Sequence, residues 1–486
     1  MKGLLIETQD YGKYFYNDET GLILKHNILL ENLIKNTNLL NSQEELRKFE
    51  DELGKYEFQR TINFYNQFNK KYVNEFKFEK TNSIKEMVEI LGFKQLIFKM
   101  TDQCNMRCKY CVYSDYYPFS ESYTDDYINI EVAKKALDYY MDNFIRIYNL
   151  YNNSKPKITF YGGEPLLNFK TIKEIINYYN ETYSEYTPEI LMTTNGLLLK
   201  DKETREFLIK NNVDICLSLD GYMENHDRNR VLADGGKTYS QILDILNDYF
   251  LDYDRIYFLA CYDYKTDMIK MKDFFQDISK KKKYLIRASQ IDESSESYYQ
   301  QFNEEDIVAF VDKYKKLQTE TIDAICKNEE ISFLGKSLYA ENLLRLKDRG
   351  KFNYSSPIFS SFSESCIPGN KLYVDSRGKF HICEKINGHF PIGDVDNGID
   401  YELVAEIIKK YNVAIAKCKK CNISRLCGNC FANMAYSDTF NEIKEDECDV
   451  RRKIYSKIFE DLIKIEIQNP NFFNSVMKKI NKTIYE

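Results

Sequence analysis

The sequence has no tryptophan, only four histidines and no cysteine before residue 104. It also has no run of about 18 consecutive apolar residues, the length that a membrane-spanning helix needs, so we expect no membrane segment. The N-terminal stretch has no apolar core of signal-peptide length, and we therefore expect a cytoplasmic protein. Because the cytoplasm keeps thiols reduced, the 13 cysteines indicate metal or redox chemistry rather than disulfides.

The sequence also has no excess of basic residues. The net charge is -7 with both signs interspersed, so the chain carries no basic field that would attract nucleic acid. The one lysine run, at residues 280–283, precedes an apolar stretch and is typical of a solvated turn. The 486 residues are enough for about two to four domains. Hydrophobic residues make up 43% of them, which allows a sizeable core and argues against global disorder.

The N-terminal segment, residues 1–90, combines three short strand patterns with a charged helical stretch. This combination is typical of a small winged-helix-like α+β module; the alternative is a helical appendage that only packs on the next domain. From residue 93, strand and helix patterns alternate about six times. The alternation predicts an α/β fold over residues 91–300, with a parallel sheet curled as a partial or full barrel.

The rest of the chain divides into three parts. Residues 301–360 have the pattern of an uninterrupted helical bridge, and residues 361–455 are rich in cysteine and short turns. Residues 456–486 are assigned to a C-terminal helix whose pattern starts near residue 447.

Three cysteines, Cys104, Cys108 and Cys111, follow the first strand of the alternating region with C-x3-C-x2-C spacing. Thiolates are soft ligands that select zinc, Cu(I) or iron–sulfur clusters. Structural zinc needs four ligands, and no histidine lies near this loop. A 4Fe–4S cluster held by three thiolates instead keeps one iron free for an exogenous ligand. In a barrel, this loop and the GGEP, TTNG and SLDG loops all lie at the strand ends where chemistry takes place.

The cysteine loop, with Tyr110 before its last cysteine, resembles the hallmark motif of the radical SAM superfamily. The resemblance implies a partial (β/α)6 TIM-like barrel and a 4Fe–4S cluster that binds S-adenosylmethionine at its open iron. In that family the reduced cluster cleaves S-adenosylmethionine to a 5′-deoxyadenosyl radical. Cys104, Cys108 and Cys111 would then be both cluster ligands and catalytic residues.

Further loops match the superfamily's contacts to S-adenosylmethionine. The GGEP motif is the family's contact to the ammonium group, and an arginine such as Arg230 pairs with the carboxylate in related maturases. Ser218 and Arg230 could instead have ordinary surface or capping roles, and Asn195 could serve a turn. The residues that the resemblance implies for cofactor binding are Tyr110, Gly162, Gly163, Glu164, Pro165, Asn195, Ser218, Asp220 and Arg230.

Three cysteines occur singly between the two cysteine-rich segments. Cys216 and Cys261 lie in strand patterns between apolar residues, and Cys326 lies in a helical pattern. All three are predicted to be small core residues.

The seven C-terminal cysteines resemble the SPASM extension of radical SAM maturases, which holds two auxiliary 4Fe–4S clusters. The resemblance assigns Cys366, Cys383 and Cys430 to an inner cluster. It assigns Cys418, Cys421, Cys427 and Cys448 to an outer cluster. The four-cysteine run ends in C-x2-C where the family has C-x3-C, which puts the role of Cys430 in doubt. Zinc is the competing interpretation of this run. No fourth ligand is evident between Cys366 and Cys383, so an open or solvent-ligated iron is favoured for the inner cluster.

The resemblance covers about residues 93–455 and points to maturases of ribosomally made peptides (RiPPs), particularly Cys-rich ones. It implies an oxidoreductase that abstracts hydrogen from a precursor peptide and forms thioether crosslinks, with flavodoxin or ferredoxin as electron donor. The N-terminal module would bind the leader peptide by adding a strand to a sheet edge.

Two alternatives stay open. One is an anaerobic sulfatase maturase that forms formylglycine. That family has Asp after the cysteine matching Cys383, where this chain has Glu384. Glu384 is a candidate catalytic base, or else a solvated carboxylate. The other alternative is a non-catalytic iron–sulfur protein for electron transfer or sensing.

Overall fold

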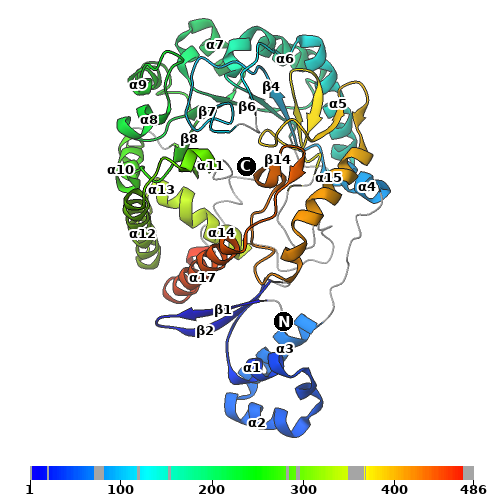
Figure 1. Ribbon diagram of the computed structural model, residues 1–486, viewed down its shortest axis with the longest axis vertical. Coiled ribbons are helices and arrows are strands. Elements are labelled where there is room, and N and C mark those ends of the chain that lie inside the picture. The colour runs from blue at the N-terminus through cyan, green and yellow to red at the C-terminus, as the bar shows by residue number, and fades with distance from the viewer. Residues whose placement is uncertain are drawn as a thin grey trace.

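A computed structural model describes residues 3–18, 21–69, 81–117, 121–151, 155–280, 284–291, 296–348, 366 and 368–473. Its centre is a ten-stranded mixed sheet with the order β13-β12-β11-β10-β4-β5-β6-β7-β8-β9. Helices surround the outer side of this sheet (Figure 1).

The six consecutive strands from β4 to β9 are parallel to their neighbours, which confirms the alternation predicted from the sequence. The strands are β4 (Gln95–Lys99), β5 (Lys157–Tyr161), β6 (Glu189–Thr194), β7 (Asp214–Ser218), β8 (Ile256–Tyr262) and β9 (Leu285–Gln290). The helices between them are α5 (Ile130–Tyr151), α6 (Phe169–Thr182), α7 (Lys202–Lys210), α8 (Met223–Asn229), α9 (Tyr239–Tyr249) and α10 (Met268–Ile278).

Alternation of side chains along these strands corrects one prediction. In β8, Phe258 and Ala260 are buried under the helices, whereas Cys261 is only partly buried. Cys216 in β7 likewise alternates with the buried Ile215 and Leu217. Successive strand side chains point to opposite faces, so both cysteines lie on the inner face and are not core residues. Cys326 packs against an apolar cluster, as predicted.

The cysteine-rich segment extends the same sheet. β10 (Lys371–Val374) is parallel to β4, and β11 (Lys379–His381), β12 (Pro391–Asp394) and β13 (Gly398–Ile399) follow as antiparallel neighbours. α15 (Tyr401–Ala414) packs on α4 (Thr81–Leu91). Shorter elements complete this part: α16 (Phe431–Met434), β14 (Ala435–Tyr436) and β15 (Thr439–Phe440). β10 to β13 therefore continue the same sheet as the parallel strands.

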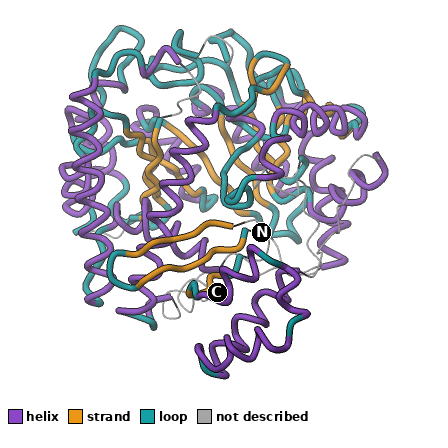
Figure 2. The backbone as a smooth tube through the Cα atoms, turned by 60° about the horizontal axis from the view of Figure 1, so that its bottom comes forward, coloured by secondary structure: helices purple, strands orange, loops and turns teal. Residues whose placement is uncertain are grey.

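The N-terminal segment has the three strands that its sequence predicts. β1 (Gly3–Thr8), β2 (Gly12–Asn17) and β3 (Ile23–Lys25) form a separate antiparallel sheet in this order. α1 (Ile28–Lys35), α2 (Gln43–Leu53) and α3 (Lys55–Asn69) follow. Figure 2 shows the helices projecting from the body of the molecule while the strands lie along it. β1 packs against α17 (Glu445–Gln468), so the segment is joined to the C-terminal part.

The helical bridge is interrupted, contrary to the prediction. α12 (Glu304–Lys327) ends because Asn328 adopts the left-handed conformation, with a φ of 57°. α13 (Phe333–Gly335), a π-helical turn (Lys336–Ala340) and α14 (Glu341–Asp348) follow, and α11 (Glu296–Tyr299) precedes the bridge. α17 starts at Glu445, so the boundary expected at residue 456 falls inside a helix; residues 474–486 lie outside the described part.

Within the described residues, no helix has both the length and the apolar character needed to cross a membrane. Lys280 is exposed and pairs with Asp277 over 2.6 Å, while the rest of the lysine run lies outside the described residues.

Candidate functional site

The cysteine loop follows β4 and is fixed by a strand-like contact with the segment after α8. The N–H of Arg107 donates to the Val231 carbonyl over 2.8 Å. The N–H of Lys109 donates to the Asn229 carbonyl over 3.0 Å. The loop that carries the three cysteines is therefore positioned by the same segment that carries Arg230.

The thiols of Cys104, Cys108 and Cys111 are close enough to influence one another's ionisation. Burial raises the pKa of Cys104 to about 12 and the pKa of Cys108 to about 11. Metals bind the thiolate, so these groups become ligands only where strong positive charge offsets their burial. Three partly buried thiols in one loop fit a metal cluster, which supplies that charge.

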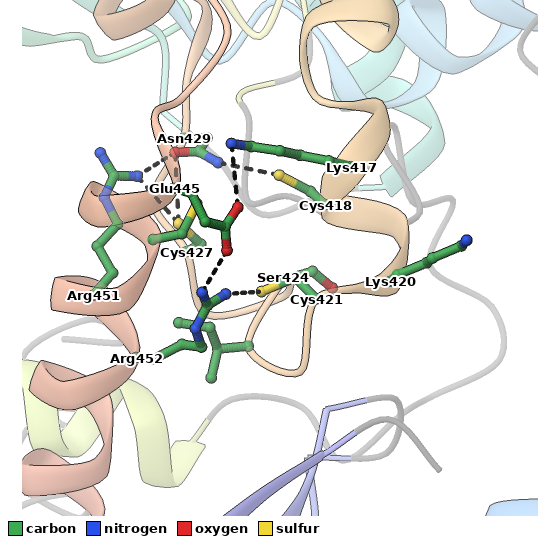
Figure 3. A pocket seen from close by; sticks show the side chains of 12 residues that line it. Lys417, Cys418, Lys420, Cys421, Ser424, Cys427, Asn429, Glu445, Arg451 and Arg452 are labelled. Atoms are coloured by element: carbon green, nitrogen blue, oxygen red, sulfur yellow. Dashed lines mark hydrogen bonds and ion pairs between the residues drawn. The ribbon is translucent and has the colours of Figure 1, made fainter.

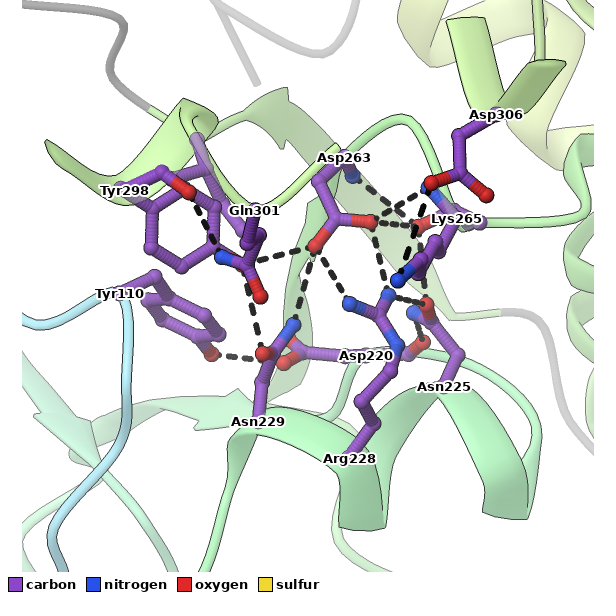
Figure 4. A network of polar contacts seen from close by, with 12 residues as sticks. Tyr110, Asp220, Asn225, Arg228, Asn229, Asp263, Lys265, Tyr298, Gln301 and Asp306 are labelled. Atoms are coloured by element: carbon purple, nitrogen blue, oxygen red, sulfur yellow. Dashed lines mark hydrogen bonds and ion pairs between the residues drawn. The ribbon is translucent and has the colours of Figure 1, made fainter. Parts of the chain in front are cut away.

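Arg230 is a buried cation beside this loop, with 7% of its surface exposed. Its Nη1 donates to Tyr110 Oη over 2.7 Å, and Tyr110 Oη donates to Asp220 Oδ2 over 2.6 Å. The other oxygen of Asp220 accepts the Cys261 N–H over 2.9 Å. Figure 4 shows Tyr110 and Asp220 pointing toward one another.

The guanidinium of Arg230 has donor capacity to spare. Its Nε is buried and makes no hydrogen bond, and no carboxylate among the described residues lies within ion-pair distance of it. A buried, unpaired guanidinium is costly unless an anion completes it. The site therefore fits a ligand with a carboxylate next to the three thiols.

The GGEP loop packs directly on the cysteine loop. The Gly163 N–H donates to the Thr101 carbonyl and the Glu164 N–H donates to the Gln103 carbonyl, both over 2.8 Å. A Cβ at Gly163 would lie 2.1 Å from the Gln103 carbonyl oxygen, and Gly162 has a φ of 130°. Both glycines are needed because the two backbones approach so closely.

Glu164 is a buried anchor between two loops. Its carboxylate accepts the Thr194 hydroxyl over 2.7 Å and the Asn195 N–H over 2.9 Å. A third bond comes from the Leu166 N–H over 3.1 Å, and the buried Pro165 starts the short 3-10 turn Pro165–Asn168. Burial raises the pKa of the Glu164 carboxyl. The Glu164 carboxylate thus accepts its three hydrogen bonds from groups of the protein itself.

Asn195 serves a turn, one of the two roles considered for it, and also contacts the cysteine loop. Its Oδ1 accepts the Leu197 N–H over 3.0 Å, which makes a turn. Its Nδ2 donates to Asn105 Oδ1 over 2.7 Å and lies 3.8 Å from Cys104 Sγ. Ser218 lies at the end of β7, partly buried on the same face as Cys216.

A buried polar network around Asp263 was missed by the sequence reasoning (Figure 4). Arg228 binds both carboxylate oxygens of Asp263 at 2.7 Å, and Tyr298 Oη donates to one of them over 2.7 Å. Burial opposes ionisation, but the hydrogen bonds and charge of Arg228 outweigh it and lower the pKa of Asp263. Asn229 also donates to this carboxylate, over 3.2 Å. The network holds the end of α8, whose Asn229 carbonyl receives the cysteine loop.

The residues assigned to the inner cluster are electrostatic neighbours. Burial is the main cause of the raised pKa of the Cys430 thiol, and negative charge at Cys366 raises it further. Burial likewise raises the pKa of Cys383, and negative charge at Cys430 adds to this. Glu384 pairs with Lys371 Nζ over 3.1 Å and its side chain is 15% exposed. It is therefore a partly buried ion pair rather than a solvated carboxylate.

The residues assigned to the outer cluster line one cavity of about 220 Å³ (Figure 3). Its cysteines are Cys418, Cys421, Cys427 and Cys448. Nitrogen atoms lie beside three of the sulfurs: Asn429 Nδ2 is 3.8 Å from Cys418, Arg451 Nη1 is 3.2 Å from Cys427 and Arg452 Nη1 is 4.0 Å from Cys421. Lysine and arginine side chains around the cavity suit an anionic group bound by four thiolates.

Within the described part of the chain, no three His, Cys, Asp or Glu side chains converge closely enough to hold a single ion. Tetrahedral zinc requires such convergence. The thiolates of a 4Fe–4S cluster bind different irons and are spread around it, so their spacing is wider.

Residues 98–252 match the radical SAM superfamily. An uncharacterized protein of Methanocaldococcus jannaschii is 34% identical over 130 residues, which are 27% of this chain and 40% of that protein. The radical SAM cyclopropyl synthase TigE of Paramaledivibacter caminithermalis is 23% identical over 384 residues, covering 76% of this chain and 74% of the relative. A cysteine-type anaerobic sulfatase-maturating enzyme of Clostridium novyi is 26% identical over 171 residues, or 34% of this chain and 42% of the enzyme.

The fold is similar to the solved structure of native anSMEcpe with bound AdoMet and Cp18Cys peptide. The TM-score is 0.54 at 20% identity, and the match covers 79% of this chain and 98% of the other. This similarity concerns the fold alone; the match over residues 98–252 confirms the superfamily predicted from the cysteine loop, because that part of the chain is a radical SAM domain.

Proposed function

We propose that this chain, with its radical SAM domain over residues 98–252, is a peptide-modifying oxidoreductase that binds a 4Fe–4S cluster and S-adenosylmethionine at the cysteine loop. Its substrate is a ribosomally made, Cys-rich precursor peptide, and its product is a thioether crosslink. One observation carries the proposal: Arg230, a buried guanidinium with an unpaired Nε, lies beside the cysteine loop, close enough to Cys108 to affect its ionisation.

Cys104, Cys108 and Cys111 would hold the cluster, and Arg230 would hold the carboxylate of S-adenosylmethionine through its planar fork. When bound, the cluster and S-adenosylmethionine supply a 5′-deoxyadenosyl radical. Tyr110 orients Arg230 through its 2.7 Å hydrogen bond. The GGEP loop packs closely on the cysteine loop and would hold its cysteines in place around the cluster.

Two auxiliary 4Fe–4S clusters complete the proposed enzyme. The shared cavity of Cys418, Cys421, Cys427 and Cys448 supports the outer one. The proximity of Cys430 to Cys383 and of Cys366 to Cys430, visible in their effects on ionisation, supports the inner one, in which three thiolates leave an iron for solvent or a substrate cysteine. These clusters would accept the surplus electron that thioether formation releases, and flavodoxin or ferredoxin would reduce the first cluster.

The partner class is supported by the relatives. TigE is described as a cyclopropyl synthase, and anSMEcpe was solved with a bound peptide. The N-terminal sheet offers β3 as an edge strand, because within the described residues β3 pairs with β2 alone. A leader peptide could add to this edge by backbone hydrogen bonds.

A second candidate function is the formation of formylglycine, favoured by the match to an anaerobic sulfatase-maturating enzyme. Glu384 follows Cys383 where that family has Asp, and it is held by Lys371 over 3.1 Å. Its position next to a proposed cluster ligand suits a base for either reaction. Mass spectrometry of the modified peptide distinguishes the two, because a thioether and an aldehyde change the mass differently.

The test is Arg230→Ala and Arg230→Lys, compared with Arg255→Ala at an exposed ion pair. Loss of a charged hydrogen-bonding partner should weaken S-adenosylmethionine binding by about 10- to 100-fold in Arg230→Ala. Arg230→Lys should recover only part, because lysine lacks the bidentate fork. Arg255→Ala should bind like the wild type. Binding is measured anaerobically by calorimetry, and 5′-deoxyadenosine by chromatography.

Unchanged affinity in Arg230→Ala would contradict the assignment of Arg230. Absence of 5′-deoxyadenosine from reduced wild-type protein would instead favour the non-catalytic iron–sulfur protein.

A further inference from the structure

The N-terminal sheet reaches into the loop between two of the C-terminal cysteines. Asp18, directly after β2, is 1% exposed. Its Oδ2 accepts the Ser424 hydroxyl over 2.7 Å, and its Oδ1 accepts the Arg425 N–H over 3.2 Å. Ser424 and Arg425 lie in the loop between Cys421 and Cys427. A carboxylate from the start of the chain thus holds a turn that lies 406 residues away in sequence.

This turn belongs to the wall of the outer cavity. Ser424 is 1% exposed and lines the cavity together with the four cysteines. Figure 3 shows Ser424 beside Cys421, with the N-terminal strands passing close to this loop. Asp18 is therefore only one hydrogen bond removed from the cavity.

Apolar packing reinforces the same contact. The Tyr16 ring lies 4.5 Å from the Phe459 ring, and Phe459 is on α17, the helix that carries Cys448. Tyr16 Oη donates to Asp18 Oδ1 over 3.3 Å. Ile6 and Tyr16 share one buried cluster with Ile423, Leu426 and Phe459.

We propose that the N-terminal module completes the outer cluster site, with Asp18 as the positioning residue for the Cys421–Cys427 loop. This inference rests on the proposed outer cluster. The four ligands come from one loop region and from α17, so their geometry depends on how that loop is held against the helix. Removing the carboxylate takes this acceptor away from a buried hydroxyl and a backbone N–H, which weakens the hold on the loop.

The contact gives the N-terminal module a role beyond peptide binding. A ligand that stabilises the β1–β3 sheet also stabilises the loop that holds the cluster, and the linkage must be reciprocal. Occupancy of the outer cluster and binding to the N-terminal sheet are then coupled through Asp18.

The experiment uses the full chain with Asp18→Ala, Asp18→Asn and Ser424→Ala. Asp10→Asn, in the exposed β1–β2 turn, is the matched control. Iron and sulfide per chain are measured after anaerobic reconstitution, and iron release to a chelator is followed over time. Wild type should hold about twelve irons in three clusters. Asp18→Ala should hold about eight, and Ser424→Ala and Asp18→Asn should release about four irons several-fold faster than wild type.

Wild-type iron content and wild-type release rates in Asp18→Ala would overturn the inference. If circular dichroism shows that Asp18→Ala does not fold, the test rests on Asp18→Asn and Ser424→Ala. Wild-type rates of iron release in both variants would then overturn the inference. If Cys427→Ala holds as much iron as wild type, or if wild type holds zinc, the outer cluster is absent and the premise fails. The two failures are therefore distinguishable without any measurement of activity.

Discussion

At Arg230, a buried guanidinium makes its hydrogen bond to a phenol rather than to a carboxylate. Beyond that phenol, the two oxygens of Asp220 already accept Tyr110 Oη and the Cys261 N–H. The protein therefore does not fully compensate the positive charge of Arg230, whose Nε has no hydrogen-bond partner. In a buried site, where charges are poorly screened, this leaves a strong preference for an anionic ligand.

Glu384 gives a second prediction at the level of one residue. If it is the base that removes a proton from the substrate, Glu384→Gln should lower peptide turnover by about 100-fold or more. Reductive cleavage of S-adenosylmethionine should be unchanged, because Arg230 and the first cysteine loop are intact. Glu442→Gln, at an exposed position in the same segment, serves as the control. Turnover within twofold of wild type in Glu384→Gln would leave Glu384 only as the ion-pair partner of Lys371.

At the scale of strands and loops, the parallel strands and the four converging loops could be predicted because each strand is short, apolar and followed by a helical pattern. The face on which Cys216 and Cys261 lie was predicted wrongly, although a signal existed. Ser218 was expected at the site, and Cys216 is two residues before it on the same strand. Because side chains alternate with a period of two, Cys216 had to share its face.

Other features had no local signal. Asp263, Arg228 and Tyr298 come from β8–α10, α8 and α11, so only the folded chain brings their side chains together. The same holds for β10, which joins β4 across more than 270 residues of sequence. Pairing partners this distant are set by tertiary packing and not by propensity.

The contact between the GGEP loop and the cysteine loop predicts a sensitive position at Gly163. In Gly163→Ala the new Cβ would lie 2.1 Å from the Gln103 carbonyl oxygen, so one backbone must move. We expect a destabilisation of about 1–3 kcal/mol and loss of S-adenosylmethionine binding, because the displaced loop carries Cys104. Gly388→Ala is the control, since its Cβ would meet nothing within 4 Å.

Thermal unfolding and S-adenosylmethionine binding are measured for both glycine variants. Wild-type behaviour of Gly163→Ala would show that the two loops can separate without cost. Equal destabilisation of Gly388→Ala would show that the effect is not specific to the contact.

At the scale of the whole molecule, one sheet leads into two of the three proposed cluster sites. β4, which leads into the first cysteine loop, is hydrogen-bonded to β10, and β11 leads into Cys383. The N-terminal sheet is attached to the far end of this arrangement through Asp18 and Tyr16. Removing the N-terminal module would therefore expose the apolar residues that it packs against α17. Such a deletion would not distinguish loss of peptide binding from loss of the outer iron–sulfur cluster.

A substitution at the edge of β3 separates these two effects. The His26 N–H donates to the Lys13 carbonyl of β2, so in this antiparallel pair the Lys25 N–H points away from β2. Lys25→Pro removes that outward donor and keeps the β2–β3 ladder, which proline tolerates on an edge strand. We expect precursor-peptide affinity to fall by about tenfold, the value of one or two backbone hydrogen bonds, with iron content unchanged.

Lys25→Ala keeps the N–H and controls for the lost charge. Anaerobic fluorescence anisotropy of labelled precursor measures the affinity. If Lys25→Pro binds the precursor as tightly as Lys25→Ala, the peptide does not add to β3.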